Sequence, residues 1–206
     1  MLWKKILIVS ALWAWMAGGT FAAECGNPSA KAVNLDLAST RSLLSPDQQW
    51  RFISVGPSSL DQVAMIYIQN RKSSQKWNVG SIERDGRAFW SDDSRRLFLR
   101  DEYAADDTKL RVFEITGSRP KEIKGLDNRI RRAIFARIPE NETTQLLYYP
   151  KACFAENDSA TIIVVADAPL VRKRESSKGK DFRLKLTVDL ISFQILIEAP
   201  KATTFP

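Results

Sequence analysis

The chain has 206 residues, of which 31 are Lys or Arg and 24 are Asp or Glu, and it contains no histidine. The missing histidine excludes the nucleophile arrangements in which a histidine base activates serine or cysteine. Two cysteines without histidine also cannot supply the usual ligands of a zinc site. Any catalysis would rest on carboxylates or lysine, and the sequence predicts neither a bound cofactor nor a metal.

The first residues have the three-part layout of a secretory signal. A short basic start (MLWKK) precedes the apolar run ILIVSALWAWMA, and the small residues Thr20 and Ala22 suit the two key positions of a cleavage site. The apolar run is shorter than the roughly 20 residues that a transmembrane helix needs. We therefore expect residues 1–22 to be a bacterial-type signal that exports the protein to the periplasm or the extracellular space. A membrane anchor is the alternative, and no second apolar run is long enough to span a membrane.

Residues 23–200 are expected to form one β-rich domain, followed by a loose tail at residues 201–206. The signal carries lysines but no acid, so the exported chain stays basic. A basic surface either is simply solvated or binds an acidic partner. Because an exported protein rarely meets nucleic acid, we expect a protein, an acidic glycan or another envelope component as the partner.

The cysteines Cys25 and Cys153 are an even pair in an exported chain, which predicts one disulfide. Such a bond would close a loop of more than about 100 residues and would stabilise the fold by roughly 4–5 kcal/mol in the chain-entropy model. Two free thiols are the alternative.

Alternating apolar and polar residues predict β-strands along most of the chain. Polar turn signals separate them, among them Ser45–Asp47, Asn70–Gln75 and Asp85-Gly86. The predicted strands are Val33–Leu37, Trp50–Val55, Gln62–Gln69, Trp77–Arg84, Arg96–Arg100, Lys109–Ile115, Gln145–Tyr149, Thr161–Ala166 and Phe182–Leu190. Beyond Leu190 the apolar residues switch phase, which indicates a bulge or a bend within a long strand.

One segment has a helical period instead. Apolar residues recur every fourth position from Leu126 to Ile138, and Pro139 follows. This spacing predicts an amphipathic helix over Asn128–Arg137, with Asp127 or Asn128 as its N-cap. The opposite face of that helix carries Arg129, Arg131, Arg132 and Arg137.

Two basic elements are the candidates for binding a partner. The first is this helix face, and the second is the polar segment Arg172–Asp181, expected to be an exposed loop. The candidate partner-binding residues are Arg129, Arg131, Arg132, Arg172, Lys173, Arg174, Lys178 and Lys180. The alternative for the helix is an ordinary surface helix that packs its apolar stripe on a sheet.

Three stretches share a polar turn, with Asp as its third residue, that runs into an apolar strand. They are SPDQQWRFIS from Ser45, SDDSRRLFLR from Ser91 and ENDSATIIVV from Glu156, so the turn residues are Asp47, Asp93 and Asp158. The repetition favours a structural role for Asp93 over an acidic catalytic site at Asp92-Asp93. The first two copies are about 46 residues apart, a spacing typical of a four-stranded propeller blade. The longer second spacing is consistent with an insertion that contains the helix.

SPDQQWRFIS and FWSDDSRRLFLRD resemble the blade motif of TolB-type β-propellers, in which Ser-Pro-Asp-Gly-Lys forms a turn between apolar strands. The match lies mainly within residues 44–115 and continues more weakly from Phe154 to Ala166. In the second copy Asp92 and Ser94 replace the proline and the glycine of the motif. The resemblance implies an exported recognition scaffold and carries no activity, because function belongs to sites and not to folds.

The expected fold is mainly β, with propeller-like antiparallel sheets and one helix. A propeller usually closes with four to eight blades, so we expect a small or incomplete propeller, or a half that closes by pairing as a homodimer. A β-sandwich-like stack is the alternative. Trp50, Trp77 and Trp90 lie within residues 44–115, the part of the chain that matches the repeat best, which favours core packing over a glycan-binding platform.

These observations together predict an exported, non-enzymatic binding or scaffold protein that recognises a macromolecule. The alternative is a carboxylate-dependent glycan-active enzyme, which needs two carboxylates roughly 5–10 Å apart in a cleft.

Overall fold

The computed structural model describes residues 32–56, 63–104, 107–138, 140, 142–144, 147–155, 158–172 and 178–198. The predicted signal at 1–22, the tail at 201–206, Cys25, Lys173 and Arg174 lie outside the described residues.

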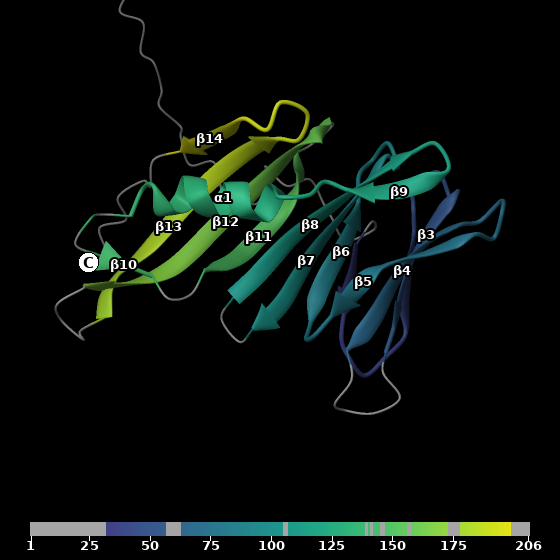
Figure 1. The fold of residues 1–206 in the computed structure, drawn as a ribbon, viewed down its shortest axis with the longest axis horizontal. Helices are drawn as coiled ribbons and strands as arrows, with labels where there is room; N and C mark the ends of the chain where they lie inside the picture. The colour runs from purple at the N-terminus through teal and green to yellow at the C-terminus, as the bar shows by residue number, and fades with distance from the viewer. Residues whose placement is uncertain are drawn as a thin grey trace, which may run out of the picture.

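The described residues form three antiparallel β-sheets and one helix (Figure 1), which confirms the predicted mainly-β fold class. The first sheet has the order β2 (Arg41–Leu44), β3 (Trp50–Val55), β4 (Ala64–Asn70) and β5 (Lys76–Ile82). The middle sheet has the order β1 (Ala32–Leu35), β6 (Gly86–Trp90), β7 (Arg96–Ala104), β8 (Asp107–Thr116) and β9 (Arg119–Glu122). The third sheet contains β10 (Glu142–Thr143), β11 (Tyr148–Ala155), β12 (Asp158–Arg172), β13 (Lys178–Asp189) and β14 (Ile195–Glu198), with β10 and β11 both pairing with β12.

Each sheet contains a meander of four consecutive strands, and the middle sheet packs both of its faces. One face carries Trp90, Leu97 and Leu99, which join a buried cluster with Trp50 and Phe52 of the first sheet. The other face carries Phe89, Phe98 and Val112, which join a second cluster with side chains of the third sheet, among them Ile162, Val164 and Leu186. The three sheets are therefore stacked in chain order around two separate cores, without forming a closed barrel.

The repeated turns adopt the same conformation in the first two copies. Ser45 Oγ donates to Asp47 Oδ1 (2.6 Å), and the same carboxylate oxygen accepts from the Gln49 amide (3.0 Å). Ser91 Oγ donates to Asp93 Oδ1 (2.7 Å), which accepts from the Arg95 amide (3.0 Å). In both turns the fourth residue has a positive φ, 59° at Gln48 and 61° at Ser94.

The third copy keeps the central contact, because Asp158 Oδ1 accepts from the Ala160 amide at 2.8 Å. An aspartate that accepts the amide two residues ahead therefore marks the hairpin between the first two strands of each meander.

Consecutive turns also contact one another. The Asp47 amide donates to Ser94 Oγ (3.0 Å), so the first turn is joined to the second. Ser159 Oγ donates to Asp93 Oδ2 (2.6 Å), so the third turn is joined to the second. In each case the fourth residue of one turn meets the third residue of the turn before it.

A second kind of turn ends two of the meanders, and it corrects the predicted bulge beyond Leu190. Strand β13 ends at Asp189, whose Oδ1 accepts from the amides of Ile191 (2.7 Å) and Ser192 (2.9 Å). Phe193 then takes φ 58°, and the chain returns as β14. The phase switch is thus a tight hairpin and not an irregularity within one strand. Asn70 Oδ1 forms the equivalent contacts in the hairpin before β5.

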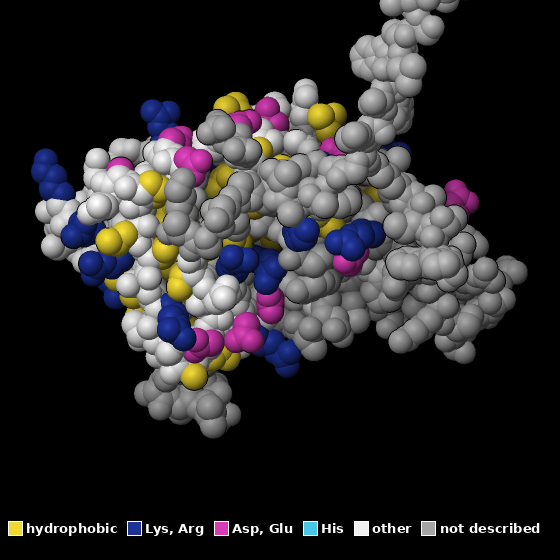
Figure 2. All heavy atoms as spheres, turned by 180° about the vertical axis from the view of Figure 1, so that it is seen from behind, with side chains coloured by type: hydrophobic (Ala, Val, Ile, Leu, Met, Phe, Trp, Pro, Cys, Tyr) yellow, Lys and Arg dark blue, Asp and Glu magenta, His cyan; other side chains and the backbone are white. Residues whose placement is uncertain are grey.

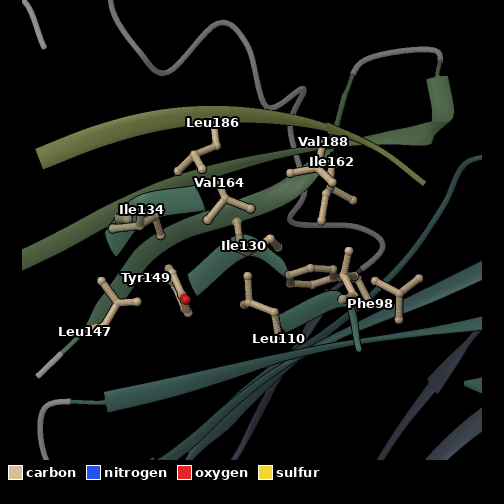
Figure 3. Close-up of a cluster of buried hydrophobic side chains, with 14 of the residues drawn as sticks. Phe98, Leu110, Ile130, Ile134, Leu147, Tyr149, Ile162, Val164, Leu186 and Val188 are labelled. Carbon is tan, nitrogen blue, oxygen red and sulfur yellow. The ribbon is translucent and has the colours of Figure 1, made fainter. Parts of the chain in front are cut away.

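Helix α1 (Leu126–Phe135) packs its apolar stripe into the core between the middle and third sheets. Ile130 and Ile134 point among Leu147, Tyr149, Val164 and Leu186 (Figure 3). The stripe was predicted correctly, but the helix begins and ends two residues earlier than predicted.

The predicted N-cap of α1 is wrong. Gly125 is the N-cap, in the left-handed conformation (φ 76°) and without a side-chain cap bond. The Asp127 carboxylate instead accepts from the Leu110 amide (3.0 Å) and so joins the helix to β8. The Asp127 side chain therefore makes a tertiary contact in place of the capping contact that the local sequence pattern predicts.

Other boundaries also differ from the prediction. Strand β12 extends to Arg172, and strand β13 begins at Lys178. Both ends of the predicted loop Arg172–Asp181 are therefore strand. Gly86 begins β6 in a different sheet from β5, so Asp85-Gly86 connects two sheets and does not close a hairpin. A Cβ at Gly86 would lie 2.6 Å from the Arg100 carbonyl oxygen, which requires glycine there.

Replacing Asp93 with Ala should lower the free energy of unfolding by about 1–3 kcal/mol, because three donors lose their acceptor. Asp47→Ala is the matched control: its carboxylate serves the same two donors within its own turn but no donor of the next turn. Urea titration should rank Asp93→Ala as the more destabilised variant. Equal losses would show that the contact with Ser159 contributes nothing.

The disulfide stays a prediction, because Cys25 lies outside the described residues. Cys153 is on β11 with 6% of its surface exposed. Peptide mapping under non-reducing conditions should recover Cys25 linked to Cys153, and reduction should lower the melting temperature. Two separately alkylated cysteine peptides would contradict the prediction.

Candidate functional site: the exposed basic face of α1

The exposed face of α1 combines cationic and aromatic side chains. Arg129 and Arg132 are exposed, and neither forms an ion pair with a described carboxylate. Phe135, one turn beyond Arg132, is 45% exposed. Arg137 is exposed just after the helix. We call these four residues the basic face of α1.

Neighbouring elements hold this face in position. The Arg129 guanidinium lies 4.8 Å from the ring centroid of Phe193, in the hairpin between β13 and β14. Arg132 Nε donates to the Asn128 carbonyl oxygen (3.3 Å) within the helix. Because Leu126, Ile130 and Ile134 are buried beneath, the exposed side chains project from a fixed backbone.

Arg131 was predicted to bind a partner, but the structure places it in an internal ion-pair network. Its Nε donates to Asp127 Oδ2 (2.7 Å), and its Nη2 donates to Asp107 Oδ1 (2.9 Å) and to the Thr108 carbonyl oxygen (2.6 Å). Burial opposes the charge, yet the bonds to the two carboxylates raise the pKa of Arg131 above its usual value. Arg131 thus joins the helix to β8 and cannot also serve an external ligand without breaking these bonds.

The second basic element lies at the end of the long β12–β13 hairpin. Arg172 is the last residue of β12 and pairs in register with Glu142 of β10. Lys178 is the first residue of β13 and pairs with Val171 of β12. Lys180 follows on β13. Lys173 and Arg174 fall outside the described residues, so this element stays a prediction.

A hollow of about 680 Å³ lies beside β1 and is lined by both acids and bases. Among them Asp36 accepts from Ser39 Oγ (2.7 Å) and Arg41 Nη2 (2.8 Å), and these bonds lower the pKa of Asp36. Glu102 pairs with Arg100 Nη2 at 2.6 Å. The lowered pKa makes Asp36 a poor proton donor.

Asp101 is a buried carboxyl that the sequence did not single out. It lies on β7, on the same face as Leu97 and Leu99, with 6% exposed and with Oδ1 lacking a hydrogen-bond partner. Burial raises the pKa of Asp101 to about 6, which Glu83 and Glu102 favour and Arg111 and Lys109 oppose. Asp101 does not line the hollow beside β1.

Two further features of the described residues bear on function. No group of three or more His, Cys, Asp or Glu side chains in the described ranges is arranged to hold a metal ion. Within the same ranges, no helix has both the length and the apolar character needed to cross a membrane.

Trp50 and Trp90 are buried, and Trp77 packs against Trp50 with ring centroids 5.8 Å apart.

Comparison with known proteins gives little direct guidance. No family model matches the chain, and no curated protein matches it in sequence. Among solved structures, one from Agrobacterium tumefaciens that carries a provisional TolB assignment matches with 13% identity and a TM-score of 0.35. The match covers 77% of this chain and 49% of the other, so this chain spans about half the length of that structure. The relationship is a weak resemblance at the level of the fold.

Stability should depend on pH through Asp101. Because the folded state holds the proton more tightly, the contribution of the protonated carboxyl is present below about pH 4 and is lost as the pH rises through about 6. The loss should be about 3 kcal/mol, and Asp101→Asn should remove this pH dependence. Asp85→Asn, which changes an exposed carboxyl nearby, should retain it. Urea denaturation between pH 4 and 8 tests both variants, and an unchanged slope in Asp101→Asn would contradict the assignment.

Proposed function

We propose that this protein is an exported, non-enzymatic binding protein that holds an acidic macromolecule, a protein or an acidic glycan, on the basic face of α1. One observation carries the proposal. Arg129 and Arg132 are exposed and pair with no carboxylate of the described residues, and they lie near a half-exposed Phe135 on a helix whose other side is fixed in the core. The secretory layout of the N-terminus supports the location in the periplasm or outside the cell.

The face fits an acidic partner for electrostatic and entropic reasons. Guanidinium groups bind carboxylates, sulfates and phosphates through paired hydrogen bonds, and they attract such partners over longer distances. Phe135 supplies exposed apolar area at the end of the helix, and aromatic residues are common in binding hot spots. Since the helix backbone is already ordered, binding need not order it.

The β12–β13 hairpin extends the proposal to a second basic element. In the sequence, Arg172, Lys173 and Arg174 would add three positive charges to this element. A partner that contacts both elements would gain affinity from two linked sites.

Neither Asp101 nor the arginine-paired carboxylates of the hollow beside β1 favour the glycan-active alternative. A glycosidase acid needs a raised pKa and a place in the substrate cleft. Asp101 has the raised pKa, but it is buried between the first and middle sheets. The carboxylates of the hollow beside β1 include Asp36 and Glu102, which are paired with arginines.

Reversing the charge of both Arg129 and Arg132 to Glu should weaken binding to immobilised polyglutamate and to heparin at least tenfold, and wild-type binding should weaken as salt rises. The matched control is Lys72→Glu with Arg84→Glu, two exposed cations on the first sheet and its exit, which give the same change in net charge. Equal binding by both double variants would show that net charge alone attracts the probes.

A triple charge reversal at Arg172, Lys173 and Arg174 tests the hairpin separately. If the hairpin belongs to the site, capture of the same two probes should fall by a similar factor. Unchanged capture would remove these residues from the site and leave the basic face of α1 as the proposal.

A further inference from the structure

Strand β1 is an edge strand of the middle sheet. It pairs with β6 over Ala32–Leu35, and in the order of the described strands none lies on its other side. Alternate residues of an edge strand direct their N–H and C=O groups away from the sheet, where they can pair with another chain. Among the described residues, none outside β6 forms a backbone hydrogen bond with β1. Within this part of the chain, the outer edge of β1 therefore presents unpaired donors and acceptors.

The hollow of about 680 Å³ lies along this edge. All four residues of β1 and the following Asp36 line it, whereas β6 contributes Gly86 alone. A hollow above the face of the sheet would be lined by several residues of both strands. Arg100 and Glu102 of β7 and Arg41 of β2 also line it. The edge of β1 thus faces a space of the size that binding sites usually have.

The two sides of β1 offer different surroundings to an added strand. Successive residues of a strand face opposite sides of the sheet. Leu35 is buried and Val33 is partly buried in the core with the first sheet. Asn34 lies on the other side, in register with Arg87, whose guanidinium lies 4.9 Å from the ring centroid of Phe89. Alternate side chains of an added strand would lie beside Val33 and Leu35 or beside Asn34, so alternating apolar and polar residues suit it.

One carboxylate sets the net charge of the hollow. Asp36 pairs with Arg41 (2.8 Å) and Glu102 pairs with Arg100 (2.6 Å), so these four charges cancel. Asp85, which also lines the hollow, is exposed and forms no ion pair with a described cation. Acidic and basic side chains are interspersed over the described surface in the view from behind (Figure 2), without one large acidic patch. A basic side chain of the added strand would therefore find its counter-charge at Asp85.

We infer that the edge of β1 binds an extended segment of a partner protein by strand addition, with apolar and polar residues in alternation and a Lys or Arg at the Asp85 end. Main-chain hydrogen bonds supply the affinity of such a site, and contacts of alternate side chains supply its selectivity. Antiparallel pairing, the commoner arrangement, places the first residue of the segment opposite Asp36. Asp85 lies at the same end, because Gly86 pairs with Leu35. The site is separate from the basic face of α1, and the inference does not depend on the proposed function.

The peptide KVTVT, capped at its N-terminus and labelled with a neutral dye at its C-terminus, meets these requirements and is the probe. Fluorescence anisotropy should show saturable binding to the chain without its predicted signal, and about fivefold weaker binding of EVTVT. Asp85→Lys should reverse this preference. The matched control Glu83→Lys makes an equal charge change at an exposed residue that does not line the hollow, and should keep the preference for KVTVT. An absence of saturable binding, or an equal loss of preference in both variants, would overturn the inference.

Peptides with methylated amides test the backbone pairing. One peptide carries N-methyl groups on its two valines, and another carries them on its two threonines. Because only one of these sets of amides can face β1, one peptide should bind about tenfold more weakly and the other should bind like the parent. Bound KVTVT should also slow hydrogen exchange of the β1 amides, whereas the amides of β14, another edge strand, should exchange at an unchanged rate. Equal binding of both methylated peptides, or unchanged exchange in β1, would exclude strand addition.

Discussion

The hydrogen bonds between successive aspartate turns are the constraint on which the stack depends. Each sheet could pack its apolar face against a neighbour in many registers, because hydrophobic contact is not directional. The bonds from the Asp47 amide to Ser94 and from Ser159 to Asp93 connect particular atoms of neighbouring sheets. They fix the offset and the order of the sheets, and the two cores are then filled in that arrangement.

Ser94 shows how a departure from the resembled motif is used. The motif has glycine at this position, which suits the left-handed conformation, and serine there adopts φ 61° at a steric cost. In return, the Ser94 hydroxyl accepts the Asp47 amide of the preceding sheet. Asp92, beside it, is exposed at the turn position that proline occupies in the motif.

Much of the fold could be predicted because its signals are local. Alternation located the strands, and spacing located the buried stripe of α1. What failed depended on distant partners or on short elements. Strand β9 (RPKE) is short and has no apolar alternation. Asp127 does not cap its helix, because its carboxylate accepts from the distant Leu110 amide. The bond between Arg131 and Asp107 spans 24 residues, and no local pattern separates Arg131 from Arg129 and Arg132.

Helix α1 shows where this architecture tolerates inserted sequence. The chain leaves the middle sheet at β9, forms the helix and enters the third sheet, while the bond between Ser159 and Asp93 remains in place. The joint between two sheets can therefore hold an added element without loss of sheet order. Because Leu126, Ile130 and Ile134 fill the core, only the exposed side chains of this helix are open to exchange, so recognition can change on its outer side while the packing beneath is kept.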